Sequence, residues 1–283
     1  MSVAAIVITF NRIDFLKKVI AALKNQTVKP DEIIVVNNSS SDGTGEWLER
    51  QSGLNVITQA NTGSSGGQYT GIKAAFDNGH DWIWTMDDDI LPHENVLEII
   101  SKPEDPLLVR MPLRYTVEDK PFLNDTIEFN LDNPFKSIWV EILSEKHLDK
   151  ERISVDGPTF EGPLFHRSLV EKIGLPERDF FIYGDDSEYF IRAKKAGYKL
   201  EIFTKAKMSK LIKYNMQNKQ FDWKSYFVIR NLIAIDVLHG SVPVRLLRPF
   251  AYAAAWMKAA GKPRDILTVI KALKNGYFYK SNK

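Results

Sequence analysis

Three consecutive aspartates, Asp87, Asp88 and Asp89, are the strongest chemical signal in this sequence. They follow the apolar and β-branched run 82–86, which predicts a buried strand that ends at the acids. In an extended segment alternate side chains share a side, so Asp87 and Asp89 should face one way and Asp88 the other. Two carboxylates on one side suit Mg²⁺ or Mn²⁺, which take oxygen ligands and share themselves with phosphates. A solvated acidic loop is the plainer alternative.

A second acidic group, Asp185, Asp186 and Glu188, stands where a helical pattern begins. Either aspartate could be the N-cap of that helix, worth about 1 kcal/mol, but both cannot occupy the cap. The helix dipole keeps a carboxylate at this end ionised, which suits a group that accepts a proton from a hydroxyl. Asp186 is therefore a candidate general base.

A third signal is the run NTGSSGGQYTGIKAA at residues 61–75, where small and hydroxyl residues lead into a helix. Glycines and hydroxyls there allow a ligand to approach the backbone and the helix N-terminus. The run lacks the G-x-G-x-x-G and G-K-[ST] spacings, which argues against a Rossmann dinucleotide site and a P-loop. It indicates either a ligand-binding turn or only a tight turn.

The elements that must position these groups alternate along the chain. Strand patterns cover 3–10, 31–38, 54–60 and 81–86, and helical patterns cover 14–26, 44–51, 66–79, 166–174, 187–197 and 224–240. Residues 101–156 show only short strand-like pieces. This order predicts an α/β fold with a mainly parallel sheet flanked by helices, in which ligands bind at the carboxyl ends of the strands.

Composition and charge narrow the classes of protein. The 283 residues fit one enlarged domain, or a domain with a small appendage. The 38 Lys and Arg against 36 Asp and Glu give no overall reason to expect nucleic acid as a partner. Cysteine is absent, which excludes disulfides and thiol nucleophiles. Because no apolar run approaches the ~20 residues of a membrane span and the N-terminus lacks a signal-peptide pattern, we expect a cytoplasmic protein, either soluble or peripheral on the inner face of the membrane.

The tail differs from the rest of the chain, so we divide the sequence into a domain at 1–240 and a basic amphipathic helical tail at 241–283. The tail carries nine Lys or Arg and one acid, Asp265, interleaved with large apolar residues at helical spacing. It could lie on an anionic membrane surface. Alternatively, it is an ordinary amphipathic helix that packs on the domain.

Taken in order, five motifs resemble those of the family 2 inverting glycosyltransferases with the GT-A fold. They are IVITFNR, IIVVNNSSSDGT, NTGSSGGQYTGI, WTMDDDILP and FIYGDDSEYFIRAKKAGYK, and they cover roughly residues 3 to 200. The three-Asp form, the later YFVIRN and the ending VIKALKNGYFYK look like the galactofuranosyl- and rhamnosyltransferase branch.

The resemblance implies a role for each matching residue. Asp186 would be the catalytic base, Asp87 and Asp89 would hold the metal on the diphosphate, and Asp88 would face the ribose or donor sugar. The residues implied for the nucleotide are Thr9, Phe10, Arg12, Asn37, Asn38, Asp42, Asn61, Gly66 and Gly67. Looser candidates for the acceptor or the donor sugar are Asp185, Glu188, Trp139, Glu161 and His166, of which Trp139 and His166 fit core packing equally well.

Two positions depart from the family pattern. Asn37 stands where the family often has an acid, and its amide can still hydrogen-bond a pyrimidine edge. The segment after the catalytic helix carries Lys207 and Lys210 where the family usually supplies a metal-binding His.

The implied reaction is a metal-dependent, inverting transfer of a sugar from a nucleotide-diphosphate donor, with Mg²⁺ or Mn²⁺ as cofactor. UDP-galactofuranose is the first donor expected and dTDP-rhamnose the second. The acceptor would be a saccharide, expected on a lipid carrier, in cell-surface polysaccharide synthesis. Two other classes stay open: a sugar-phosphate nucleotidyltransferase, and an inactive nucleotide-sugar-binding protein, which the missing His motivates.

Overall fold

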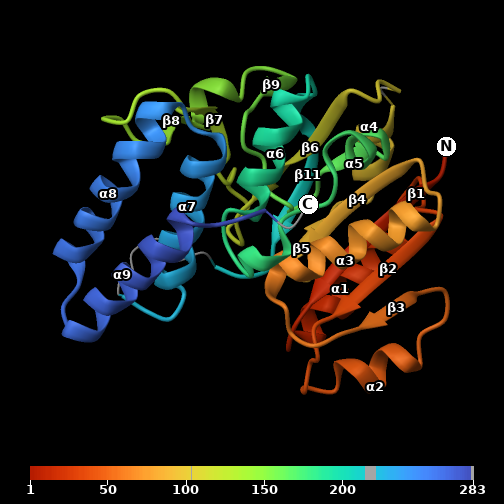
Figure 1. Cartoon of the computed structure of the whole chain (residues 1–283). Helices are drawn as coiled ribbons and strands as arrows, with labels where there is room; N and C mark the ends of the chain where they lie inside the picture. The colour runs from red at the N-terminus through yellow and green to blue at the C-terminus, as the bar shows by residue number, and fades with distance from the viewer. Residues whose placement is uncertain (103, 214–220, 282–283) are drawn as a thin grey trace.

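A mixed sheet forms the centre of the molecule in the computed structural model, which describes residues 1–102, 104–213 and 221–281 (Figure 1). Its strands are β1 (Val3–Thr9), β2 (Glu32–Asn37), β3 (Asn55–Thr58), β4 (Trp82–Asp87), β5 (Ile90–Pro92), β6 (Leu108–Tyr115), β9 (Arg152–Ser154), β10 (Leu164–His166) and β11 (Lys199–Lys210). They lie in the order β3-β2-β1-β4-β10-β6-β11-β5, with β9 on β11. A separate ribbon pairs β7 (Thr126–Phe129) with β8 (Trp139–Ile142).

The first half of the sheet is parallel. β1 pairs in parallel with β2 and β4, and β2 pairs in parallel with β3. The connections are α1 (Ile13–Lys24), α2 (Thr44–Glu49) and α3 (Gly63–Asp77). The predicted α/β fold with a mainly parallel sheet is thus confirmed. In the second half, β10 runs antiparallel to β4 and β6, and β11, a strand absent from the sequence-based prediction, runs parallel to β6.

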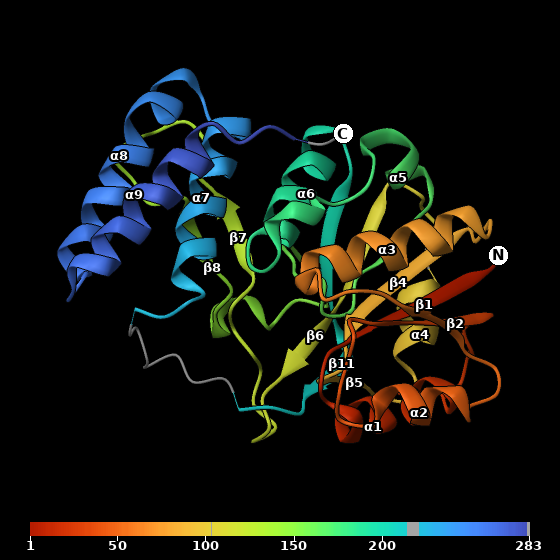
Figure 2. The ribbon, with the colours of Figure 1, turned by 60° about the horizontal axis from the view of Figure 1, so that its bottom comes forward.

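Alternate side chains of β1 divide the core between the two faces of the sheet. Ala4, Ile6 and Ile8 pack in one core with α3, and with α5 (Ser168–Ile173) and α6 (Asp185–Lys195). Val3 and the other alternate side chains pack in the second core with α1, α2 and α4 (Val96–Ser101). Figure 2 shows α3 and α5 on one side of the sheet and α1 and α2 on the other. The period of two in this strand therefore sets the layers.

The predicted tail forms two helices that pack beside a third. α7 (Ser225–His239) contacts both α8 (Val242–Ala259) and α9 (Pro263–Tyr277), at the end of the molecule away from β1 to β3 (Figure 1). Their shared core contains Ile229 and Ile233 of α7. A buried ion pair joins Arg248 of α8 to Asp236 of α7 at 2.5 Å. Residues 282–283 of the predicted tail lie outside the described residues.

Among the described residues, short 3₁₀ turns also form at Glu145–His147 and Arg178–Phe180. Among the described helices, none combines the length and the apolar character that a membrane span requires.

Gly71 lets α3 lie directly on the sheet, and this gives a stability test. A Cβ at Gly71 would collide with the side chain of Ile6, whereas a Cβ at Gly45 in α2 would meet only the amide of Asn37 at 3.9 Å. We expect Gly71→Ala to lower the free energy of unfolding by about 1–3 kcal/mol through overpacking. The control Gly45→Ala should raise it by about 0.5–1 kcal/mol because alanine is the better helix former. Urea unfolding measures both, and equal effects would contradict this account of the packing.

Candidate active site

The middle aspartate of the triplet is tied to the end of β1. Asp88 is only 2% exposed and accepts hydrogen bonds from the Thr9 hydroxyl at 2.7 Å and the Phe10 backbone N–H at 3.3 Å. Arg12 Nη1 reaches Asp88 at 3.1 Å and also Asp89 at 2.8 Å. Burial raises the pKa of Asp88 to about 6, although Arg12 and Thr9 oppose this rise. Asp88 therefore has a structural role, because its hydrogen bonds join the end of β1 to the end of β4.

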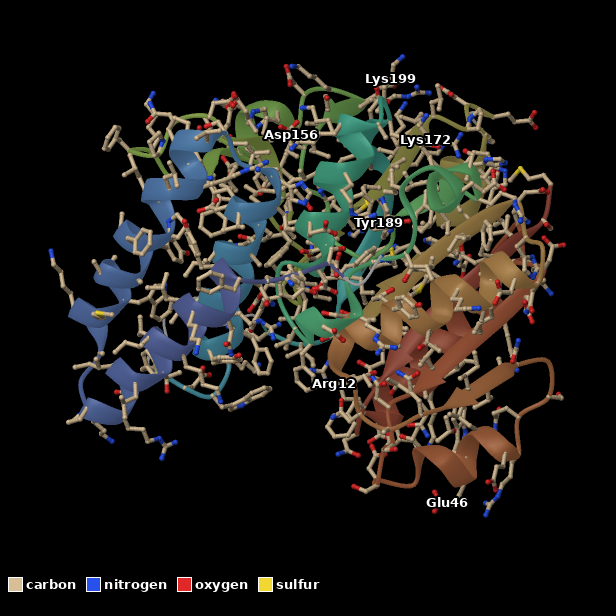
Figure 3. All side chains as sticks on the ribbon, viewed as in Figure 1. Arg12, Glu46, Asp156, Lys172, Tyr189 and Lys199 are labelled. Carbon is tan, nitrogen blue, oxygen red and sulfur yellow. The ribbon has the colours of Figure 1, made fainter. Side chains whose placement is uncertain are left out.

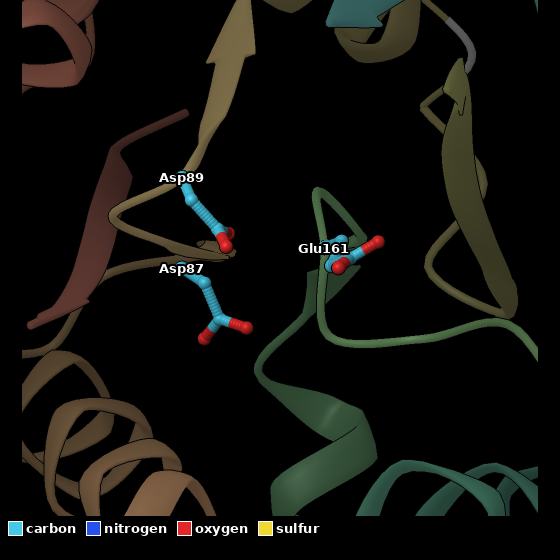
Figure 4. A group of neighbouring side chains, drawn as sticks. All are labelled: Asp87, Asp89 and Glu161. Carbon is cyan, nitrogen blue, oxygen red and sulfur yellow. The ribbon is translucent and has the colours of Figure 1, made fainter. Parts of the chain in front are cut away.

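The outer two aspartates face a third carboxylate. Oxygen atoms of Asp87, Asp89 and Glu161 all lie within 4.8 Å of one another. In Figure 4, Asp87 and Asp89 come from the end of β4 and the turn after it, and Glu161 faces them from the segment before β10. Burial, followed by the charges of Asp89 and Glu161, raises the pKa of Asp87 well above its usual value. Such crowding of like charges is the condition that a bound cation relieves.

Glu161 is held by two basic side chains that the sequence did not connect to it. Lys210 Nζ lies 2.5 Å from Glu161 Oε1, and Arg114 pairs with Oε2. Arg114 is almost fully buried and also pairs with Asp125 at 2.8 Å. Burial would raise the pKa of Glu161, but the charges of Arg114 and Lys210 overcome this effect and lower it to about 2. Glu161 is therefore ionised throughout the physiological range.

The two lysines at the departure from the family pattern have different surroundings. Lys210 is 8% exposed and lies at the carboxylate cluster through its bond to Glu161. Lys207 instead pairs with Asp119 and lies over the ring of Tyr115 at 4.2 Å. Of these two lysines, Lys210 is therefore the one that an ion pair joins to the cluster.

The second acidic group opens α6. Gly184 is the N-cap, with a left-handed φ of 80°, so neither Asp185 nor Asp186 is the cap. Burial is the main cause that raises the pKa of Asp185 to about 6 and that of Asp186 to about 7. The charges of Asp185 and Glu161 raise the pKa of Asp186 further, while the Ser187 N–H donates to its Oδ1 at 2.6 Å. The charge of Glu161, in the carboxylate cluster, therefore also acts on Asp186 at the start of α6.

Glu188, a candidate for contact with a sugar, is instead a fully buried structural group. Its carboxylate accepts hydrogen bonds from Arg192 Nε at 2.9 and 3.0 Å, and His239 Nε2 lies 3.0 Å away. Because His239 ends α7, these contacts join α6 to the helical bundle, which consists of α7, α8 and α9.

Two further acceptor candidates are not joined to the carboxylate cluster. His166 is opposite Trp82 in the β10–β4 pairing, at the other end of β4 from Asp87, with ring centroids 5.0 Å apart. Trp139 lies on β8 in the separate ribbon and is 39% exposed. The position of His166 therefore agrees with the core-packing alternative.

Several residues predicted to contact the nucleotide lie at or just after the ends of β1 and β2. Asn38 donates from Nδ2 to the carbonyl oxygen of Gly63 at 3.1 Å, and Asn37 Oδ1 accepts from the Ser40 N–H at 3.0 Å. Asp42 accepts from the backbone N–H of Ile13 at 3.0 Å, at the start of α1. Phe10 and Arg12 remain partly exposed, and Figure 3 places Arg12 toward the middle of the molecule.

The small-residue run begins the helix earlier than predicted, at Gly63. Asn61 Oδ1 accepts from the Gly63 N–H at 2.9 Å, which starts the turn. Gly66 and Gly67 lie inside α3, where a Cβ would collide with Thr62 and Ile8 respectively. These two glycines therefore have a packing role in the structure.

Comparison with known proteins identifies a matching family and similar relatives. The model of the family "Glycosyl transferase family 2" matches residues 4–174, more than half of the chain. A galactofuranosyltransferase, GlfT1, of Mycobacterium tuberculosis is 30% identical over 214 residues, covering 69% of this chain and 66% of that protein. GlfT2 of Mycolicibacterium smegmatis is 26% identical over 273 residues, covering 86% of this chain and 42% of that protein.

Solved structures share the fold at low identity. The crystal structure of GalNAc-T7 with UDP, GalNAc and Mn²⁺ has a TM-score of 0.69 at 13% identity, covering 99% of this chain and 55% of that one. That of S. aureus TarS 1–349 with UDP-GlcNAc has a TM-score of 0.60 at 15% identity, covering 98% and 82%. The fold is thus that of GT-A enzymes, and from the match over residues 4–174 we conclude that the chain belongs to glycosyl transferase family 2.

Proposed function

We propose that this protein transfers a sugar, with inversion, from a nucleotide-diphosphate sugar to a saccharide acceptor. The observation that carries the proposal is the acidic edge of the sheet, where Asp87, Asp89 and Glu161 meet opposite the start of α6 with Asp186. The names of the relatives favour galactofuranose over rhamnose as the sugar. UDP or UDP-GlcNAc in the similar structures supports a nucleotide-sugar donor.

The residues of the cluster fit a divalent cation. Asp87, Asp89 and Glu161 offer only oxygen ligands, which suit Mg²⁺ at least as well as Mn²⁺ because no imidazole is among them. When bound, such a cation supplies positive charge that stabilises a departing diphosphate. Arg12 and Lys210, which already lie at the cluster, can contribute further positive charge to the same diphosphate.

Asp186 is the residue that we propose takes the acceptor's proton. Its pKa of about 7 leaves a substantial ionised fraction at neutral pH and makes it a stronger base than an ordinary aspartate. The acceptor hydroxyl would lose its proton to Asp186, and its oxygen would attack the anomeric carbon on the face opposite the leaving nucleotide. This single displacement inverts the configuration at that carbon.

Two other classes of protein are separated by their products. A sugar-phosphate nucleotidyltransferase releases pyrophosphate, whereas the proposed transfer releases a nucleoside diphosphate. An inactive nucleotide-sugar-binding protein would bind the donor without turnover across a broad panel of acceptors. Screening nucleoside diphosphate release from a set of sugar nucleotides, with UDP-galactofuranose and dTDP-rhamnose included, therefore tests the proposal and identifies the donor.

We also propose that the helical bundle binds an anionic membrane surface on the cytoplasmic side, where a lipid-linked acceptor would be presented. Large apolar side chains lie exposed on α8 and α9: Val242, Leu246, Leu247, Phe250, Ile266, Leu267 and Ile270. The rings of Phe250 and Tyr277, 5.4 Å apart, join the two helices. Exposed basic residues accompany them: Lys258, Lys262, Arg264, Lys271 and Lys274. This combination suits the headgroup region of an anionic bilayer.

The role of Asp186 is tested by Asp186→Asn. We expect turnover to fall by about 10²–10⁴-fold while donor binding is kept. Because the raised pKa of Asp186 lowers the stability of the folded state progressively from about pH 4 to about pH 7, and by its full amount above that, the neutral variant should melt at the same temperature or higher at pH 7 and above. In the wild type, kcat/KM should rise with pH through about 7 and then level off, because kcat/KM reports the pKa of the free enzyme. Asp185→Asn should change acceptor KM more than kcat. Full activity of Asp186→Asn would end this assignment.

The cation is tested by calorimetry with Mg²⁺ and Mn²⁺, with and without nucleoside diphosphate. We expect weak binding to the protein alone, because Arg12, Arg114 and Lys210 compete for the carboxylates, and tighter binding when diphosphate oxygens complete the shell. Asp89→Asn should weaken the ternary complex, whereas the control Asp119→Asn should not.

Tight metal binding to the bare protein would contradict this competition. Undiminished turnover in chelator would show that the aspartates do not serve a metal.

The membrane surface is tested with point variants, because deleting 241–283 would uncover the core that α8 and α9 share with α7. We expect the double variant Leu246→Glu, Leu267→Glu to sediment less with vesicles containing phosphatidylglycerol, and added salt to weaken wild-type binding by screening. The matched control is Val117→Glu, on an exposed apolar residue after β6. If the wild type ignores these vesicles at low salt, the bundle has no such role.

A further inference from the structure

The turn that leads into α6 has an unusual backbone. Phe181 and Tyr183 have φ values of 65° and 66°, and Gly184 follows with 80°. Residues other than glycine rarely adopt this left-handed region and keep it only where surrounding contacts hold them there. The turn comes directly before Asp185 and Asp186, so whatever holds it also sets where these carboxylates lie.

One side chain of α7 holds three carbonyl oxygens of this turn. Asn231, which is 1% exposed, donates from Nδ2 to the carbonyl oxygens of Phe180 at 3.0 Å, Ile182 at 3.0 Å and Tyr183 at 2.6 Å. Arg230 Nε donates to Asn231 Oδ1 at 2.8 Å. Because arginine only donates and a carbonyl oxygen only accepts, these partners fix which end of the amide faces the turn.

Two further residues, Arg230 of α7 and Ser65 of α3, also hold the turn by hydrogen bonds. Arg230 Nη2 donates to the carbonyl oxygens of Asp179 at 2.7 Å and Phe180 at 2.9 Å. On the opposite side, the carbonyl oxygen of Phe181 accepts from the backbone N–H of Ser65 in α3 at 3.2 Å. The turn therefore lies between the first residues of α3 and the side chains of α7.

We infer that Asn231 is a positioning residue for Asp186: by holding the carbonyl oxygens of the turn, Asn231 sets where the Asp186 carboxylate lies at the start of α6. The inference rests on the proposed function, since it assigns Asn231 a role only through Asp186. An amide is the side chain that this position needs, because its two N–H groups serve the three carbonyl oxygens, one N–H being shared between two of them, while its oxygen accepts from Arg230. A carboxylate of the same shape lacks the donors.

The test compares Asn231→Asp with wild type in steady-state kinetics and in calorimetry with nucleoside diphosphate. We expect kcat to fall by about 10- to 100-fold, the effect of a small misplacement of a reacting group. Donor KM and nucleoside diphosphate affinity should change less than about twofold, since the nucleotide would bind at the ends of β1 and β2. The matched control is Asn275→Ala, which removes an amide that bonds the Tyr226 hydroxyl at 2.7 Å in the same bundle and does not touch the turn.

A double-mutant cycle with Asp186→Asn separates positioning from general stabilisation. If Asn231 acts through Asp186, adding Asn231→Asp to Asp186→Asn should lower the residual turnover little further. Additive losses, or a lower melting temperature with unchanged kcat per folded molecule, would overturn the inference. Should Asn231→Asp not fold, Arg230→Lys removes the contact that orients the amide while keeping the charge, and the same cycle applies. Full activity of Asp186→Asn would instead refute the proposed base, which this design detects by itself.

Discussion

The concentration of negative charge at one edge of the sheet is the constraint on which the rest of the structure depends. Asp87, Asp185 and Asp186 all have raised pKa values because burial and neighbouring carboxylates disfavour their ionised forms. A fold can hold such groups only if they stay protonated, or if basic side chains or bound cations offset their charge. Here Arg114 and Lys210 keep Glu161 ionised, and Arg12 bridges Asp88 and Asp89.

Each of these basic residues comes from a different part of the mixed sheet. Arg12 follows β1, Arg114 lies on β6 and Lys210 ends β11. β11 pairs with β6 in parallel and with β5 in antiparallel fashion, where Lys210 lies opposite Ile90, one residue after the triplet. The chain that leaves α6 thus returns to the acidic edge. The parallel half supplies the aspartate triplet at residues 87–89. The second half supplies Glu161 together with Arg114 and Lys210, which pair with it.

The sequence was sufficient where local pattern decides structure. The run 82–86 predicted β4, and Asp88 lies at Thr9 while Asp87 and Asp89 lie near Glu161, on the sides expected. The reason differs from the expected one, because Asp88 and Asp89 form the turn after β4 and are not part of an extended strand. The sequence was insufficient where strand direction decides. Because β10 runs antiparallel to β4, Glu161 comes to the carboxyl end of β4 and His166 to the other end, and no local signal gives that direction. β11 was missed because lysines interrupt its apolar pattern.

Lysine at the position where the family resemblance implies a metal-binding histidine changes how charge is balanced at this edge. A neutral imidazole would add a ligand without adding charge, whereas Lys210 adds a positive charge and occupies a carboxylate. In the part of the chain that the structure describes, Asp89 and Glu161 each pair with a basic side chain, and Asp87 pairs with none. Under the proposed function, a diphosphate and its cation would arrive with opposite charges. The diphosphate could then take Arg12 and Lys210 as partners while the cation takes the carboxylates that they leave. Such an exchange keeps Asp89 and Glu161 paired before and after binding, and the cation would supply the partner that Asp87 lacks, as a low-dielectric site requires.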